Sequence, residues 1–218
     1  MTDNINYQYI VDYIVNTIPQ SSGFLKELEE YADERFIPII QREVKGFLAT
    51  LLEYKRPRRI LEVGSAIGYS SIFFSQFLKE GGEIITLEKD EKYAAIARDN
   101  IKKAGKENII HLIEGPAEET ITTVEGKLDM VFLDANKSQY RHYFDVIFPN
   151  LNPGGIIICD NILYKGMTAN DALLPRKHYA IVKHIRDFLD FLCRHEELTT
   201  SIIPIGDGMS LSVKKGDI

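Results

Sequence analysis

The sequence contains no tryptophan, only two cysteines and no apolar run that approaches the length of a bilayer span. Cys159 and Cys193 belong to no CxxC or Cys/His spacing, so we expect neither disulfides nor a zinc site. The N-terminal residues lack the basic segment and apolar stretch of a secretory signal. These absences predict a cytoplasmic protein that has no membrane partner.

Positive charge is the minority charge, because 26 Lys and Arg stand against 32 Asp and Glu, for a net charge of −6. Such a chain has no general attraction to nucleic acid, so a polyanionic partner would need a local basic patch. Enzymes that act on small molecules are compatible with this balance. The 218 residues, 44% of them hydrophobic, suit one globular domain with a sizeable core.

Helical patterns open the chain, and strand and helix patterns alternate after them. The expected helices are 7–18, 24–36, 39–54, 70–78, 90–104, 118–123, 139–150 and 176–195, and the expected strands are 59–64, 83–88, 109–114, 128–134, 155–160, 199–205 and 209–213. This order predicts an α/β fold with a Rossmann-like, doubly wound and mostly parallel seven-stranded sheet. Gly206-Asp-Gly208 signals a hairpin, so the last strand should be antiparallel. We expect a single domain over 1–218, with an N-terminal helical cap at 1–55 and the α/β core at 56–218.

A glycine turn follows the first strand and opens a helix, in the segment Leu61-Glu-Val-Gly-Ser-Ala-Ile-Gly-Tyr-Ser70. Glycine lets the backbone pass close to a ligand there, and the amides of a helix start can meet its polar groups. Ala66 and Tyr69 replace the second and third glycines of the dinucleotide fingerprint GxGxxG, which disfavours a pyrophosphate ligand. A purely structural turn fits this segment equally well.

The second strand ends in Glu88, about twenty residues beyond the glycine turn, where such folds place the acid that accepts both ribose hydroxyls. A solvated acid is the alternative, since further charges follow in Lys89-Asp-Glu91. The turn after the third strand, Glu114-Gly-Pro-Ala117, occupies the place that usually lines an adenine pocket.

Two later strands end in oxygen-bearing side chains, at Asp134-Ala-Asn-Lys137 and at Asp160-Asn161. Either site alone fits an ordinary polar turn. Together they supply two carboxylates and an amide, which is the kind of ligand set that a hard divalent cation prefers.

With these residues the chain resembles the cation-dependent O-methyltransferases, which include the catechol and caffeoyl-CoA enzymes. The resemblance rests on the glycine turn, Glu88, the D-x-x-K of Asp134 to Lys137, the pair Asp160-Asn161 and the Gly206-Asp-Gly208 hairpin. Within that family the chain is most similar to the bacterial tRNA 5-hydroxyuridine methyltransferases, which convert the wobble uridine to 5-methoxyuridine. They share the Ile-Gly-Tyr-Ser turn, the Asp-Asn-Ile-Leu-Tyr-Lys-Gly segment and the Pro-Ile-Gly-Asp-Gly ending.

The resemblance implies a role for each of these positions. Asp134, Asp160 and Asn161 would bind Mg²⁺, and Lys137 with Asp134 would be catalytic. S-adenosylmethionine would be bound by Ile40, Glu62, Gly64, Ser70, Glu88, Pro116, Ala117 and Asp134. The N-terminal helices would cap the cofactor and contribute to a homodimer.

Three functions remain open from the sequence. The first is tRNA 5-hydroxyuridine methylation at the anticodon loop, and the second is methylation of a small catechol or phenol. The third, a noncatalytic nucleotide-binding module, is disfavoured because such a module has no need of a metal and a base. Basic clusters at Lys55–Arg59, at Arg176–His178 and along the last helix at Lys183, His184 and Arg186 could hold tRNA, or form a solvated face. The aromatic rings of Tyr69, Tyr140, Tyr143 and Tyr164 could stack on a base or a catechol, or belong to the core.

Overall fold

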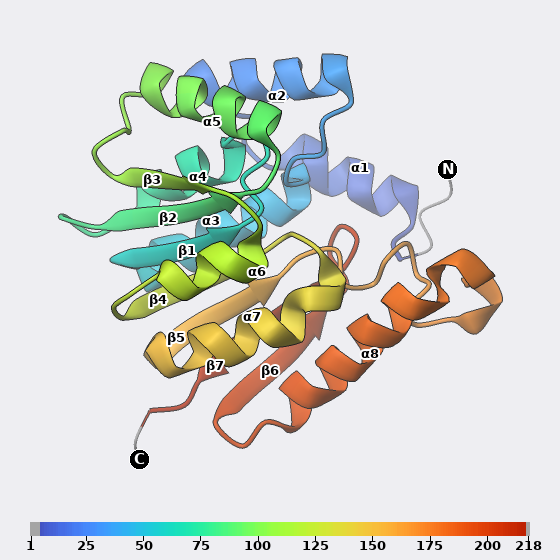
Figure 1. Cartoon of the computed structure of the whole chain (residues 1–218). Coiled ribbons are helices and arrows are strands. Elements are labelled where there is room, and N and C mark those ends of the chain that lie inside the picture. Colours follow the sequence, from blue (N-terminus) through green and yellow to red (C-terminus); the bar gives the residue numbers. More distant parts are fainter. Residues whose placement is uncertain (1–4, 217–218) are drawn as a thin grey trace.

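One seven-stranded sheet runs through the molecule and carries helices on both of its faces (Figure 1). The structure is a computed structural model and describes residues 5–216, so the first residues, in which no secretory signal was recognised, lie outside the described part. The strand order is β3-β2-β1-β4-β5-β7-β6. The strands are β1 Arg59–Val63, β2 Glu83–Glu88, β3 Ile110–Glu114, β4 Leu128–Leu133, β5 Leu151–Cys159, β6 Leu198–Ile203 and β7 Met209–Lys214. Strands β1 to β5 pair parallel, and β7 runs antiparallel between β5 and β6, which confirms the predicted mixed sheet.

The central strands are apolar on both faces because helices cover both faces. In β1, for example, Ile60 packs into one apolar cluster and Leu61 into the other, and both are fully buried. The helices are α1 Gln8–Thr17, α2 Gly23–Arg35, α3 Arg42–Lys55, α4 Tyr69–Phe74, α5 Glu91–Lys103, α6 Ala117–Thr120, α7 Tyr140–Ile147 and α8 Tyr179–Arg194. Residues of α2 to α5 bury apolar side chains in the first cluster, and residues of α7 and α8 do so in the second.

Several predicted helices end or begin in a 3₁₀ turn rather than running at full length. The 3₁₀ turns are Ser75–Phe77 after α4, Ile121–Thr123 after α6, Lys137–Gln139 before α7, Phe148–Asn150 after α7, Asp171–Leu173 and Arg176–His178 before α8. Such turns are frequent at helix ends, and hydrophobic spacing alone does not distinguish them from α-helix. No helix in the described range 5–216 combines the length and the apolar character that a membrane span requires.

Strand β5 begins earlier than the predicted residue 155. Pro153, Gly154 and Gly155 resemble a turn in the sequence, but β5 starts at Leu151, which pairs with Leu128. The register shifts between this pair and Met130, and such irregularities are where strands accommodate proline and glycine.

The strand order reverses direction between β1 and β4, since the chain goes from β1 outward to β2 and β3 and then returns to β4. Ligands of open α/β sheets bind beyond the carboxyl ends of the strands at such a switch point. The turns that follow β1, β2, β4 and β5 therefore meet at one edge of the sheet.

Candidate active site

The glycine turn after β1 lies directly against the end of β4. Gly64 has φ +102°, and a Cβ atom there would lie 2.3 Å from the carbonyl oxygen of Asp134, so only glycine fits. Its amide donates to the carbonyl of Leu87 at 3.0 Å, which carries the turn across the end of β2. Three of the predicted strand ends are thus within contact of one another.

Glu88 at the end of β2 is buried and closes this turn from the other side. Its Oε2 accepts from the amide of Ala66 at 2.8 Å, and its Oε1 accepts from the amide of Asp90 at 2.9 Å. Its own carbonyl accepts from the amide of Gly115 at 2.9 Å, so the turn after β3 also meets here. Each carboxylate oxygen has a second lone pair, which leaves Glu88 able to accept from two ligand hydroxyls.

The remaining predicted cofactor residues surround this point at different depths. Pro116 is exposed as the N-cap residue of α6, and Ala117 behind it is buried. Ile40 lies in the connection between α2 and α3 and is buried in the same apolar cluster as Ile67 and Tyr69. Pro116 is thus accessible at the turn after β3, while Ala117 and Ile40 are buried in two different apolar clusters, and their roles toward the cofactor stay predictions.

Glu62 lies beneath the glycine turn and has no accessible surface. Burial raises the pKa of its carboxyl to about 7, although hydroxyls of Ser70, Thr86 and Ser71 partly offset that effect. Oε2 accepts a hydrogen bond from Thr86, and Oε1 is buried with no partner among the described residues. Ser70, which is predicted to hold the cofactor, is thus among the groups that favour the charged form of this buried carboxyl.

The carboxylates of Asp134 and Asp160 follow adjacent strands. The amide of Asp134 donates to the carbonyl of Val63, and that of Asp160 donates to the carbonyl of Leu133, both at 3.0 Å. Asp160 is buried, and its Oδ1 accepts from the amide of Asn161 at 2.7 Å. Asn161 itself has φ +55°, a left-handed conformation that asparagine tolerates better than most residues.

Burial, and after it the negative charge of Asp134, raises the pKa of Asp160 to about 7, while the Asn161 amide and Lys137 act in the opposite direction. The repulsion between the buried Asp160 and the half-buried Asp134 would be relieved by a bound cation, so the donor set fits Mg²⁺. Among residues 5–216 no group of three His, Cys, Asp or Glu side chains forms a ready metal site. The predicted site consists of two carboxylates and one amide, and its other ligands would have to come from water or substrate.

Lys137 lies at the start of the 3₁₀ turn before α7 and is 9% exposed. Its Nζ is 3.7 Å from Oδ1 of Asp134 and 5.6 Å from the centre of the Tyr140 ring. The D-x-x-K spacing therefore places the amine beside the first carboxylate of the proposed metal site.

Asp207 joins this site although the sequence indicated only a hairpin there. Its carbonyl accepts from the amide of Leu163 at 2.9 Å, and its carboxylate accepts from the amide of Lys165. Its negative charge also contributes to the raised pKa of Asp160. The Gly-Asp-Gly pattern is the sequence signal that marks Asp207. The proximity of Asp207 to Asp160 depends on the antiparallel pairing of β7 with β5.

Three of the four candidate stacking residues belong to the core. Tyr69, Tyr140 and Tyr143 are each at most 2% exposed, and the hydroxyl of Tyr140 donates to the carbonyl of Leu133 at 3.0 Å. Tyr164 is partly exposed, and its hydroxyl lies 3.2 Å from Nδ1 of His178. Only Tyr164 among these four therefore remains available to contact a planar acceptor.

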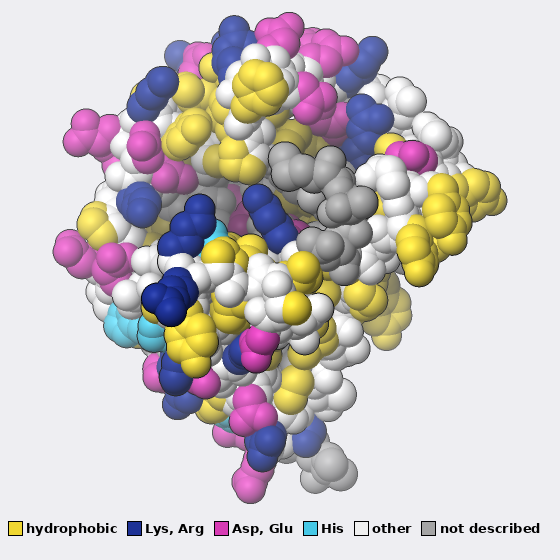
Figure 2. Space-filling model, turned by 90° about the vertical axis from the view of Figure 1, so that its right-hand side faces the viewer, with side chains coloured by type: hydrophobic (Ala, Val, Ile, Leu, Met, Phe, Trp, Pro, Cys, Tyr) yellow, Lys and Arg dark blue, Asp and Glu magenta, His cyan; other side chains and the backbone are white. Residues whose placement is uncertain are grey.

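The two basic clusters lie at different edges of the sheet. Lys55–Arg59 precedes β1 and so lies at the edge opposite to the site, where Arg59 pairs with Glu83 and Lys55 donates to the carbonyl of Gly154. The segment Arg176–His178 precedes α8, and Figure 2 shows a face of the molecule on which Lys and Arg side chains border a hollow of the surface. Arg186 is occupied by hydrogen bonds to Thr168, Met167 and Asp171 within this part of the molecule.

Residues 16–215 match the family model described as O-methyltransferase. The chain is 31% identical to a caffeoyl-CoA O-methyltransferase of Populus kitakamiensis, over 94% of this chain and 91% of that protein. It is also 31% identical to a catechol O-methyltransferase of Niastella koreensis, over 78% and 79% of the two chains. A crystal structure of an SAH-bound methyltransferase from Podospora anserina superposes with a TM-score of 0.84 at 29% identity, covering 95% of this chain and 94% of the other.

Proposed function

We propose a metal and a substrate for this chain, which belongs to the O-methyltransferase family and is an S-adenosylmethionine-dependent enzyme of the caffeoyl-CoA and catechol type. The enzyme would depend on Mg²⁺ and would methylate 5-hydroxyuridine at the wobble position of tRNA. The product would be 5-methoxyuridine, and the enzyme would act in the cytoplasm. The observation that carries the catalytic part is the convergence of Asp134, Lys137 and Asp160 beside the turn that Gly64 and Glu88 form.

The residues of the β1 and β2 ends would position S-adenosylmethionine, which supplies the methyl group on a sulfonium. Glu88 would accept from the two ribose hydroxyls, because its oxygens are held in place by two backbone amides. The turn from Gly64 to Ser70 would face the amino-acid end, and Ala117 with Ile40 would form apolar walls. Such positioning is the main contribution that a methyltransferase makes, since methyl transfer needs donor and acceptor in line and in contact.

Asp134, Asp160 and Asn161 would hold Mg²⁺, which when bound makes an acceptor hydroxyl more acidic. Lys137 would then take up or relay the proton of that hydroxyl, because it lies beside Asp134 on the same edge of the sheet. The reaction joins an anionic acceptor and a cationic donor into neutral products, so a site of low dielectric does not oppose it.

The proposed tRNA substrate is supported by basic side chains on the segment that contacts Tyr164 through His178. Arg176 and Lys177 are exposed, and they lie at the end of the connection that runs from Tyr164 and Lys165 to α8. A wobble base lies in a single-stranded loop, so it can be turned into a pocket while basic residues contact the phosphates around it. The catechol or phenol alternative is favoured by the relative of Niastella koreensis, whose name states catechol as its acceptor.

The acceptor can be identified by mass spectrometry. The protein is incubated with S-adenosylmethionine, Mg²⁺ and either tRNA that contains 5-hydroxyuridine or a panel of catechols. We expect 5-methoxyuridine in the tRNA digest and weak methylation of catechols. Efficient turnover of a catechol without any 5-methoxyuridine would establish the alternative.

We also propose a homodimer that forms through α1. This helix packs on α3 but has no buried residue, and Tyr9 and Tyr13 on it and Tyr7 at its N-cap are 69–72% exposed. A cavity of about 660 Å³ lies beside it and is lined by apolar residues of α1, α2 and α3, among them Ile14, Leu25 and Phe47. A second copy of the chain would cover this aromatic surface, which a lone protomer leaves in water.

A further inference from the structure

A buried ionic cluster connects the N-terminal helices to the glycine turn. Glu29 in α2 and Lys45 in α3 form an ion pair at 2.7 Å, and each side chain is only 10% exposed. Oε1 of Glu29 also accepts from the hydroxyl of Ser21, which precedes α2, and from the hydroxyl of Tyr69. Lys45 donates to Ser21 as well. One carboxylate oxygen therefore accepts hydrogen bonds from the α1–α2 connection, from α3 and from α4.

Tyr69 is the member of this cluster that belongs to the proposed cofactor site. It is the first residue of α4, it follows Gly68 in its left-handed conformation, and it directly precedes Ser70. Its ring is buried in the apolar cluster that contains Ile40 and Ile67. A displacement of the Tyr69 side chain would therefore move Ser70 and the end of the glycine turn.

The charges within the cluster favour one arrangement of protons. Burial acts to raise the pKa of Glu29, but hydrogen bonds from Lys45, Ser21 and Tyr69 together lower it. Burial, followed by the nearby Glu29 carboxylate, raises the pKa of the Tyr69 hydroxyl. Tyr69 is thus a neutral donor and Glu29 a charged acceptor, and a buried charge that loses its partners is strongly destabilising.

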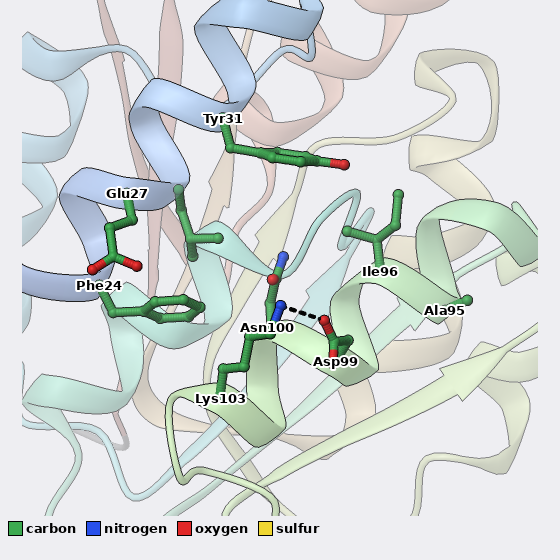
Figure 3. A pocket seen from close by; sticks show the side chains of 9 residues that line it. Phe24, Glu27, Tyr31, Ala95, Ile96, Asp99, Asn100 and Lys103 are labelled. Carbon is green, nitrogen blue, oxygen red and sulfur yellow. Dashed lines mark ion pairs between the residues drawn. The ribbon is translucent and has the colours of Figure 1, made fainter.

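Within residues 5–216, the bond between Tyr69 and Glu29 is the side-chain hydrogen bond that joins the cap to the glycine turn. Figure 3 shows a groove between α2 and α5, in which Phe24 and Tyr31 of α2 face Ile96 and Asn100 of α5. The groove has a volume of about 500 Å³, so α2 does not pack tightly on α5 along it. Asn100 donates to the carbonyl of Ile67 at 2.8 Å and holds the turn from the α5 side, while Tyr69 holds it from the cap side.

We infer that Tyr69 is a positioning residue, whose hydroxyl bond to Glu29 couples the packing of the N-terminal cap to the binding of S-adenosylmethionine at the glycine turn. The inference rests on the proposed cofactor site at Gly64–Ser70. Coupling of this kind is reciprocal, so the bound ligand stabilises the cap to the same extent as the seated cap tightens ligand binding.

Tyr69→Phe tests the coupling, because it removes the hydroxyl and keeps the ring. Tyr31→Phe is the matched control, since it removes a tyrosine hydroxyl from α2 at the groove instead of at the cluster. We expect calorimetry to show S-adenosylhomocysteine binding about tenfold weaker in Tyr69→Phe, the usual range for a lost hydrogen bond to a charged group, and unchanged in Tyr31→Phe. The rate at saturating cofactor and acceptor should change less than the affinity.

Amide hydrogen exchange separates coupling from a general loss of stability. In the unmodified protein, S-adenosylhomocysteine should slow exchange both at residues 64–70 and in α2. In Tyr69→Phe at saturating ligand, protection at 64–70 should persist while the added protection of α2 is lost. An unchanged affinity, or α2 protection that survives in the variant, would overturn the coupling alone.

No ligand-dependent protection at 64–70 in the unmodified protein would instead overturn the cofactor-site assignment, and the coupling with it. If Tyr69→Phe does not fold, the double variant Glu29→Met with Lys45→Met removes the buried pair and the acceptor of the Tyr69 hydroxyl together and leaves no unpaired charge. The same selective loss of α2 protection is expected there, and its absence counts against the coupling.

Discussion

At the scale of single residues, the site combines side chains whose environments are unfavourable without a ligand. Asp160 is buried beside Asp134, and Glu62 is buried with an unused acceptor oxygen. Native proteins keep buried polar groups of this kind mainly where they have a functional partner. The roles of both residues can be tested by measuring the stability of the ligand-free protein as well as its enzymatic activity.

Asp160→Ala should abolish methyl transfer without loss of the fold. The variant removes a predicted metal ligand and also relieves the repulsion with Asp134, so its melting temperature in metal-free buffer should equal or exceed that of the unmodified protein. Mg²⁺ should raise the melting temperature of the unmodified protein and leave that of the variant unchanged. Asp145→Ala, which alters an exposed carboxylate on α7, is the control. Full activity in the presence of excess chelator would disprove the metal assignment.

Glu62→Gln should flatten the pH dependence of stability. Burial raises the pKa of this carboxyl from 4.5 to about 7, so the unfolded chain ionises first as the pH rises. The folded state therefore loses, between pH 4.5 and pH 7, stability on the order of 3 kcal/mol that a glutamine would not lose. Urea unfolding at pH 5 and pH 8 should show the stability of the variant relative to the unmodified protein increasing with pH. Glu53→Gln, at an exposed position, should give no such trend.

At the scale of elements, the turns after the strands determine which side chains meet. The segment from Asn161 to Gly166 includes four positive-φ residues, and its amides donate hydrogen bonds to carbonyls of the β6–β7 hairpin. The β6–β7 hairpin, although distant in sequence, thus fixes the backbone of the segment that follows the proposed metal ligands. The turn after β1 is equally constrained by the end of β4.

Gly64→Ala should destabilise the protein by more than about 3 kcal/mol or prevent folding, because it combines a positive φ with a clash against the Asp134 backbone. Gly105→Ala is the control, since Gly105 has a similar left-handed conformation but open space around it. That change should cost only about 1 kcal/mol. Urea unfolding measures both, and equal losses would contradict the close approach of the two strand ends.

At the scale of the whole molecule, charge and apolar surface are distributed unevenly. The basic segment Arg176–His178 contacts Tyr164, which follows the predicted metal ligands, whereas the cluster Lys55–Arg59 lies at the opposite edge of the sheet. Since the net charge is −6, any attraction of tRNA must come from such a local patch.

The double variant Arg176→Glu and Lys177→Glu should raise the KM for tRNA at least tenfold and reduce its salt dependence, with little effect on a small catechol. Arg56→Glu changes an exposed arginine at the far edge and should leave the KM for tRNA unchanged. Steady-state rates at several salt concentrations test this pair. An equal effect of both variants would show that the segment near the site has no special role.

Tyr9→Lys together with Tyr13→Lys should convert the proposed dimer to a monomer, because the charges would be buried against the second copy. Sedimentation velocity measures the change, and Tyr179→Lys, at a similarly exposed position on α8, should have no effect. A protein that is monomeric before any substitution would refute the proposed interface.

The sequence predicted the fold class, the strand ends and the family, because each depends on local patterns. Apolar runs that end in Glu88, Asp134 and Asp160 mark the carboxyl ends of buried strands whatever the packing is. It did not predict the start of β5, because a strand irregularity and a turn share the same proline and glycine pattern.

By itself the sequence determined which chemical groups stand at the ends of the strands and in what order those strands follow. Only the tertiary structure decided which groups meet, because pairing and packing join positions far apart in the chain. It moved Tyr69, Tyr140 and Tyr143 into the core, separated the two basic clusters, and brought Asp207 to Asp160. It also brought Glu29 into contact with Tyr69. Helical spacing predicts that one face of a helix is buried, but it does not predict which residues pack against that face.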